Sequence, residues 1–243
     1  MECWKWGEGP SILFAHGWNG RGVQFNRFFG PLTEAGYSII AFDAPAHGES
    51  SGKKSSYFEL TDTIRLILNS PHHDIRGVVG HSMGGSAVIN ALSKEEISLP
   101  TVLIAPVFKL EEILFNTFNF YGIPEFVYRK AISEYENRFG YKMNDDNPIH
   151  LMPVIKTDLL VVHDRQDRAI PFQDSEEMAK SWSNVILHDT NGLGHKRILL
   201  DHKIVNRVVG YLVNRIESSE IPKLNFEQHI NTAAQLGKIS AAL

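Results

Sequence analysis

The amino-acid sequence predicts an α/β fold, a doubly wound and mostly parallel sheet with helices on both faces and a small helical cap insertion. Short apolar runs alternate with longer amphipathic stretches, as strands and helices do in such folds. Several of the runs are apolar throughout, which is typical of strands buried on both faces of a parallel sheet. The alternation is interrupted once, by a segment of more than 50 residues between the apolar runs at 102–105 and 159–162.

The expected elements follow one another regularly along the chain. The β-rich apolar runs predict strands at 12–15, 37–42, 75–79, 102–105, 159–162 and 185–187. The amphipathic stretches predict helices at 23–35, 57–69, 83–92, 172–182 and 197–215. We expect one domain over residues 1–243, because 243 residues is near the upper size that one hydrophobic core organises.

Composition excludes several classes of function. Hydrophobic residues make up 43% and charged residues 21% of the chain, which is ordinary for a globular protein. The net charge is −4 and no long run of Lys and Arg occurs, so a nucleic-acid partner is not expected. The one cysteine, Cys3, cannot form an internal disulfide. The start of the chain lacks the features of a signal peptide and no run is long enough for a membrane span, so we expect a cytoplasmic protein.

The long interruption predicts a helical cap at about 107–150. Apolar side chains at helical spacing form two stripes, divided by Pro124. The stripes are Leu110/Ile113/Leu114/Phe118/Tyr121 and Tyr128/Ile132/Tyr135/Phe139. The region holds 10 of the chain's 21 Phe and Tyr residues, which fits a cap over an apolar pocket. The alternative is that these aromatic side chains only pack the insertion onto the sheet.

The C-terminal tail, about 217–243, has a different character. It opens with a polar, linker-like stretch that ends in Pro222. Either a docked helix or a disordered terminus fits the remainder, and we assign the tail no role.

A nucleophile motif follows the strand expected at 75–79. Residues 80–84 read Gly-His-Ser-Met-Gly, the G-x-S-x-G pattern, with a helix expected directly after it. The sharp turn lifts the hydroxyl of Ser82 clear of the backbone, and the next N–H points into the same space. We therefore expect Ser82 to be a nucleophile in a nucleophile elbow.

A serine hydroxyl needs a base, and the base needs an orienting acid. In this fold type the chain order is serine, acid, histidine. Asp167 follows the strand at 159–162, and His195 follows the strand at 185–187. Both residues lie just past the carboxyl ends of strands. Ser82 lies at the same edge, where open α/β sheets bind ligands. Ser82, Asp167 and His195 are therefore the expected catalytic triad.

The sequence resembles the α/β-hydrolase superfamily over nearly its whole length up to the last long helix. The matching segments are 14–18 (Phe-Ala-His-Gly-Trp), 42–50, 80–84, Asp167 with Ile170-Pro171, and Gly194-His195. The resemblance implies an oxyanion hole formed by the N–H groups of Trp18 and Met83. It also implies acyl transfer to water, as in serine esterases.

Three departures from the family's pattern bear on these expectations. The acid-bearing strand ends in His163-Asp164 where relatives often have His-Gly, so Asp164 is a rival acid. Ala46 replaces a glycine of many relatives. The short N-terminal segment leaves room for one leading strand rather than the usual pair.

We expect a serine hydrolase that cleaves a small ester-like substrate, a carboxylic ester or a thioester, through an acyl-enzyme. The substrate pocket is expected to involve His16, His81, Phe118, Tyr121, Tyr128 and Tyr135. His16 has a second interpretation, as a brace of the oxyanion loop. No metal-ligand spacing and no nucleotide-binding loop occurs, so no metal or cofactor is expected. The alternatives are a C–C hydrolase, a peptidase, a lyase or a non-catalytic ligand-binding member of the fold.

Overall fold

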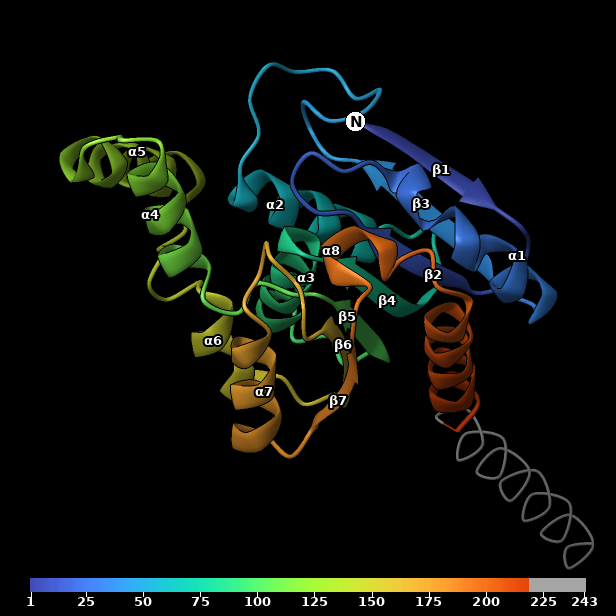
Figure 1. Ribbon diagram of the computed structural model, residues 1–243. Helices are drawn as coiled ribbons and strands as arrows, with labels where there is room; N and C mark the ends of the chain where they lie inside the picture. Colours follow the sequence, from blue (N-terminus) through green and yellow to red (C-terminus); the bar gives the residue numbers. More distant parts are fainter. Residues whose placement is uncertain (219–243) are drawn as a thin grey trace, which may run out of the picture.

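A computed structural model of the protein describes residues 1–218. In this part of the chain seven strands form one sheet in the order β1-β3-β2-β4-β5-β6-β7 (Figure 1). β1 pairs antiparallel with β3, and the other neighbouring strands are parallel. The strands are β1 (Glu2–Trp6), β2 (Ser11–Ala15), β3 (Ser38–Asp43), β4 (Ile75–His81), β5 (Thr101–Ile104), β6 (Leu159–Asp164) and β7 (Val185–Thr190). The predicted α/β fold with a mostly parallel sheet is confirmed.

The central strands bury both of their faces, which explains their unbroken apolar sequences. In β2, Ile12 and Phe14 belong to one hydrophobic cluster, whereas Leu13 and Ala15 belong to the other. Successive side chains of a strand point to opposite faces, so each face of the sheet needs its own layer of helices. A polar residue inside these runs would lose its hydration without gaining a partner.

Helices cover both faces of the sheet. α1 (Asn26–Glu34) and a last helix at 202–218 pack with one cluster. α2 (Tyr57–Leu68), α3 (Met83–Lys94) and α7 (Phe172–Ser181) pack with the other. The doubly wound arrangement leaves the carboxyl edge of the parallel strands open for a site.

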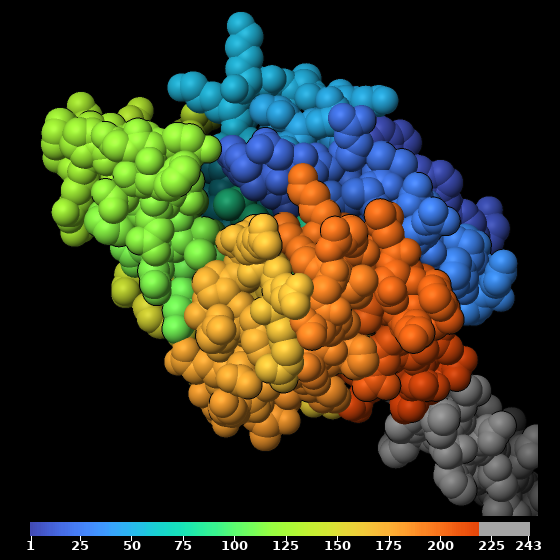
Figure 2. All heavy atoms as spheres, viewed as in Figure 1, coloured from blue at the N-terminus to red at the C-terminus, as the bar shows by residue number. Residues whose placement is uncertain are grey.

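The segment between β5 and β6 is helical, as expected. It contains α4 (Leu110–Phe120), α5 (Glu125–Phe139), α6 (Pro148–Leu151) and the 3-10 turn η2 (Met152–Val154). α4 and α5 stand out from the body of the molecule, and Figure 2 shows the surface hollowed between this green lobe and the rest. Gly140 directly follows α5, and its φ of 72° is the left-handed conformation that terminates helices.

Two predicted helices differ in detail. The helix expected at 23–35 begins as the 3-10 helix η1 (Gly22–Phe25). Asp43 anchors its start, because Gly22 N donates to Asp43 Oδ1 at 2.7 Å. The single helix expected at 197–215 was wrong. The chain forms α8 (Gly194–Arg197), a turn, and then the helix at 202–218. Asp201 caps this last helix by accepting from Lys203 N and Ile204 N.

The expected tail at about 217–243 lies almost wholly outside the described residues. Residues 217 and 218 belong to the last helix. Among residues 1–218, no helix combines the length and apolar character that crossing a membrane requires.

Candidate active site

Three of the expected site residues lie at the carboxyl ends of neighbouring parallel strands. Ser82 follows β4, Asp167 follows β6, and His195 follows β7 in the first turn of α8. β4 and β6 flank β5, and β7 lies beside β6. The sheet order therefore brings together three residues that are far apart in the sequence.

Ser82 occupies a strained turn between β4 and α3. Its φ is 55° and its ψ is −127°, a combination that few residues other than glycine adopt, and its N–H donates to Ile104 O at 2.9 Å. Two glycines make the turn possible. A Cβ at Gly84 would lie 2.3 Å from Ala15 O, and one at Gly80 would lie 2.6 Å from Gly85 Cα. The backbone thus holds the hydroxyl-bearing residue at the sharp junction that its motif predicts.

His195 and Asp167 form a close pair. His195 Nδ1 lies 2.7 Å from Asp167 Oδ2, and the Asp167 side chain is fully buried. An ionised carboxylate only accepts hydrogen bonds, so Nδ1 carries the proton and donates it. The lone pair of the neutral ring is then on Nε2, the atom a base would use.

The surroundings of Asp167 keep it ionised. Burial alone would raise the pKa of Asp167, but the contacts from His163 and His195 outweigh this and hold the pKa below its usual range. The other oxygen, Oδ1, accepts from Ala169 N at 2.8 Å and from Ile170 N at 3.0 Å. Hydrogen bonds therefore fix both oxygens, Oδ1 through two backbone N–H groups and Oδ2 through His195.

Asp164, the rival acid, has a different environment. Its carboxylate accepts from Thr190 Oγ1 at 2.7 Å and from the backbone N–H groups of Gln166, Gly192 and Leu193 at 2.9, 3.3 and 2.9 Å. Burial alone would raise the pKa of Asp164, but these donors lower it. Asp164 thus joins the end of β6 to the loop that leads to His195. Within residues 1–218, its carboxylate makes no hydrogen bond to the His195 ring.

His81 supports the other side of His195. Its Nε2 lies 2.9 Å from the backbone oxygen of His195, and the two ring centroids are 4.7 Å apart. Because a carbonyl only accepts, Nε2 donates and Nδ1 accepts from Gln24 Nε2 at 3.3 Å. Burial lowers the pKa of His81 to about 3, so this ring stays neutral. Within the described residues, Ser82 and His195 make no direct hydrogen bond, and such pairs are often loose without substrate.

Trp18 and Met83, the expected oxyanion-hole residues, both line one cavity with Ser82. Met83 is the first residue of α3, so its N–H has no acceptor within the helix. The favourable end of the helix dipole lies at the same place.

His16 braces the loop that carries Trp18 and does not line the cavity. Its Nδ1 donates to Gly17 O at 2.8 Å, and its Nε2 accepts from Ala44 N at 2.9 Å. Burial lowers the pKa of His16, in keeping with this neutral tautomer. Of the two interpretations of His16, the geometry fits the brace, and the expectation of a pocket residue was wrong because both ring nitrogens are already engaged.

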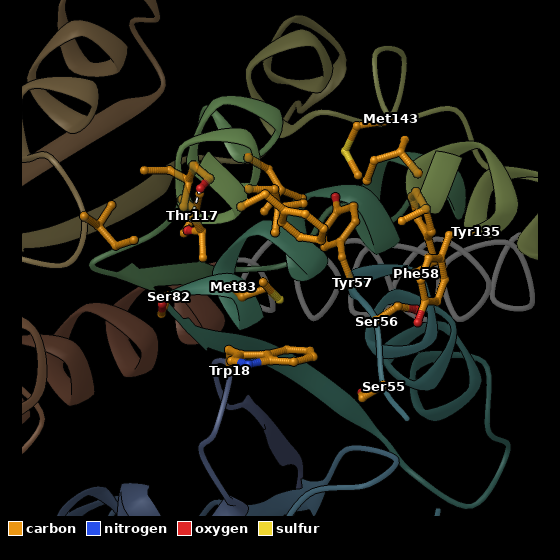
Figure 3. Close-up of a pocket in the computed structure, with 18 residues that line it drawn as sticks. Trp18, Ser55, Ser56, Tyr57, Phe58, Ser82, Met83, Thr117, Tyr135 and Met143 are labelled. Atoms are coloured by element: carbon orange, nitrogen blue, oxygen red, sulfur yellow. Dashed lines mark hydrogen bonds between the residues drawn. The ribbon is translucent and has the colours of Figure 1, made fainter. Parts of the chain in front are cut away.

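An apolar cavity of about 480 Å³ extends from Ser82 into the space under α4 and α5. Figure 3 shows Ser82, Met83 and Trp18 on one side of it, with Phe58 and Tyr135 on the opposite side. The lining is dominated by aliphatic and aromatic side chains, including Leu110, Ile113, Leu114, Phe118 and Ile132 of the two cap helices. Its size and apolar lining are those of a small-molecule pocket.

The expected pocket aromatics divide into two groups. Phe118 and Tyr135 line the apolar cavity. Tyr121 lies just beyond the end of α4 and is 72% exposed, so its expected place in the pocket was wrong. Tyr128 was also misplaced: its ring packs between the helices against Phe115 and Phe118.

A second cavity, of about 330 Å³, also borders Ser82. His81 lines this cavity rather than the apolar one, together with His195.

Several lining residues carried no signal in the sequence analysis. Tyr57 and Phe58, at the start of α2, and Met143, after α5, line the apolar cavity. Tyr57 and Phe58 stood in the helix expected at 57–69, and no motif marked them as lining a site. Among residues 1–218, no group of three or more His, Cys, Asp or Glu side chains is arranged to hold a metal ion.

The chain is similar to known proteins in family, sequence and structure. The model described as "Alpha/beta hydrolase family" matches residues 12–208. The AB hydrolase superfamily protein YisY of Bacillus subtilis (strain 168) is 22% identical over 250 residues, which cover 86% of this chain and 93% of that protein. The dihydrolipoyllysine-residue acetyltransferase component of the acetoin cleaving system of Cupriavidus necator is 29% identical over 106 residues, 42% of this chain. The chain spans 28% of the length of that component, and 58% and 30% of two other curated relatives.

Solved structures share the fold. The esterase EaEST from Exiguobacterium antarcticum has a TM-score of 0.63 at 18% identity, covering 86% of this chain and 94% of that one. The monoacylglycerol lipase of Paleococcus ferrophilus has a TM-score of 0.64 at 18% identity. The match covers 88% of this chain and 100% of that one. At these identities the likeness shows the fold alone.

Proposed function

Since this chain belongs to the alpha/beta hydrolase family, we propose that it is a serine hydrolase that cleaves small ester-like substrates through an acyl-enzyme. The observation that carries the proposal is the 2.7 Å contact between His195 Nδ1 and Asp167 Oδ2 at the strand edge where Ser82 lies. This contact leaves Nε2 of His195 unprotonated and able to take the serine proton.

In the first half of the reaction, Ser82 Oγ attacks the substrate carbonyl carbon while its proton passes to His195 Nε2. The carbonyl oxygen becomes an oxyanion, which the N–H groups of Trp18 and Met83 stabilise. The bond to the leaving oxygen or sulfur then breaks, and the proton on Nε2 passes to the departing atom. In the second half, water gives a proton to Nε2 and attacks the acyl carbon. Ser82 Oγ then leaves and takes that proton back.

The substrate's acyl group occupies the apolar cavity. The cavity begins at Ser82 and is lined by the cap helices, so an apolar chain bound there is removed from water. Each buried methylene then contributes about 0.8 kcal/mol until the cavity is full. The cap, residues about 107–150 of a single domain, thereby limits the length of the acyl chain.

Hydrolysis of p-nitrophenyl esters of graded chain length tests this function. We expect the wild type to release p-nitrophenol with an optimum at a small or medium acyl length, and Ser82→Ala to lose the activity by several orders of magnitude. His195→Ala should do nearly the same, because the residues act as a unit. Full activity of Ser82→Ala would refute the proposal.

A further inference from the structure

Ser82 borders two cavities of different character. The apolar cavity, described above, contains Ser82 and Trp18 but not His195. The second cavity of about 330 Å³ contains Ser82, Trp18 and also His195. Trp18, half exposed, is thus common to both cavities, and the two are distinguished by the presence of the histidine.

The second cavity, here called the polar cavity, is rich in hydrogen-bond donors. Asn19, Asn26 and Lys196 line it beside apolar residues such as Val23 and Leu199, and no Asp or Glu does. Within the described part of the chain, none of the side chains of Asn19, Asn26 and Lys196 makes a hydrogen bond or an ion pair. The amides can donate as well as accept, whereas the ammonium group of Lys196 only donates. Its unpaired positive charge therefore favours a negatively charged ligand that brings oxygen acceptors.

The direction of proton transfer tells the two cavities apart. When the tetrahedral intermediate collapses, the proton held by His195 must reach the departing oxygen or sulfur directly. The leaving atom therefore lies on the histidine's side of Ser82. Of the two cavities, His195 lines the polar cavity and not the apolar one. The remainder of the leaving group therefore extends into the polar cavity.

We infer that the polar cavity is the leaving-group subsite and that it favours an oxygen-rich, negatively charged leaving group. The inference rests on the proposed function and deepens it. The preferred substrate class is then an ester or thioester with an apolar acyl chain on one side and an anionic alcohol or thiol on the other. Phosphorylated or sulfonated alcohols have this chemistry.

A pair of esters with the same butanoyl group tests the inference. Their phenol leaving groups carry a para-sulfonate or a para-trimethylammonium substituent, and each kcat/KM is divided by the rate of alkaline hydrolysis of the same ester. We expect wild type to prefer the sulfonate, and Lys196→Met to reduce the ratio of the two values about two- to fivefold, the range for an exposed charge pair. Lys196→Arg should keep the preference, because the positive charge remains. Lys203→Met is the matched control: Lys203 is exposed, lies seven positions further along and does not line the cavity.

A chain-length series with one leaving group completes the test. Leu114→Ala, in the apolar cavity, should move the acyl preference toward longer chains without moving the ratio of sulfonate to trimethylammonium. A wild-type preference for the trimethylammonium ester, or an unchanged ratio in Lys196→Met, would overturn the inference while leaving a Ser82-dependent hydrolase intact. If instead Ser82→Ala hydrolyses both esters at the wild-type rate, the proposed function itself is wrong.

Discussion

His163 Nε2 lies 3.3 Å from Asp167 Oδ2, and both side chains are fully buried. The same oxygen receives His195 Nδ1, so two imidazole rings face one carboxylate oxygen. His163 Nε2 makes no hydrogen bond, so it meets Asp167 as a close contact between ring and carboxylate. Its other nitrogen, Nδ1, lies 2.7 Å from Ser175 Oγ, which fixes the ring.

His163 is accordingly expected to position Asp167 rather than to touch substrate. His163→Ala should lower kcat about tenfold or more, because small displacements of a catalytic group are costly. Ser175→Ala is the control, since it removes the outer contact and keeps the ring, and we expect a smaller loss. KM should change little in either variant. A higher KM with an unchanged kcat would contradict the positioning role.

Substitution should give Asp167 and Asp164, the two acids at the end of β6, different roles. Asp167→Asn should lower kcat by about 10⁴-fold, because the histidine loses the acceptor that fixes its tautomer. Asp164→Asn should chiefly lower the free energy of unfolding, by about 1–3 kcal/mol, because the Thr190 hydroxyl and the Leu193 N–H lose a charged acceptor. Steady-state kinetics and urea unfolding of both variants check this. A catalytic loss at Asp164 with an active Asp167→Asn would reverse the assignment.

The lowered pKa of His81 leads us to expect that the free energy of unfolding depends on pH. Its folded-state pKa of about 3 lies below the unfolded value of ~6.5, so between these values the unfolded chain binds the additional proton. The contribution of His81 to the free energy of unfolding is therefore fully present above about pH 6.5. It falls with decreasing pH, by up to about 1.4 kcal/mol per pH unit. Urea unfolding of wild type and His81→Gln at pH 7.5 and pH 5 measures the difference. The variant should lose less stability on acidification, and equal losses would show that His81 is not the responsible group.

Much of this arrangement could be predicted from local sequence. The strands were recognisable because burial on both faces demands unbroken apolar runs, and Ser82 because a sharp turn between strand and helix demands glycines. Asp167 and His195 followed from their places after strands. These signals are local, and the parallel topology of the sheet then places the three residues at one edge.

Long-range contacts were not predictable. A helical stripe shows that Tyr128 is buried but not against which neighbour, and the partner proved to be α4 rather than the pocket. Tyr121 continued the stripe past the point where α4 ends, so its periodicity had no structural meaning. The contact of His81 with His195 joins residues 114 positions apart.

Two phenylalanines of α4 test the acyl pocket. Phe118 lines the apolar cavity, whereas Phe120 is 83% exposed. Phe118→Ala should move the preferred p-nitrophenyl ester to a longer chain, because the removed ring frees volume beside the acyl group. Phe120→Ala, the same change two positions away, should leave the preference in place. An identical chain-length profile in both variants would mean that the cap aromatics only pack.

The central claim, that Ser82 is a nucleophile activated by His195, is tested most directly by covalent labelling. The hydroxyl oxygen of Ser82 should attack the phosphorus of a fluorophosphonate and displace fluoride, giving a stable phosphonyl ester. Mass spectrometry of the peptide that contains residues 80–84 locates the label, and the rate of labelling is measured for wild type, Ser82→Ala and His195→Ala. The account predicts a single adduct on Ser82, none in Ser82→Ala, and labelling slowed by orders of magnitude in His195→Ala. A label on another residue, or equal rates in wild type and His195→Ala, would contradict it.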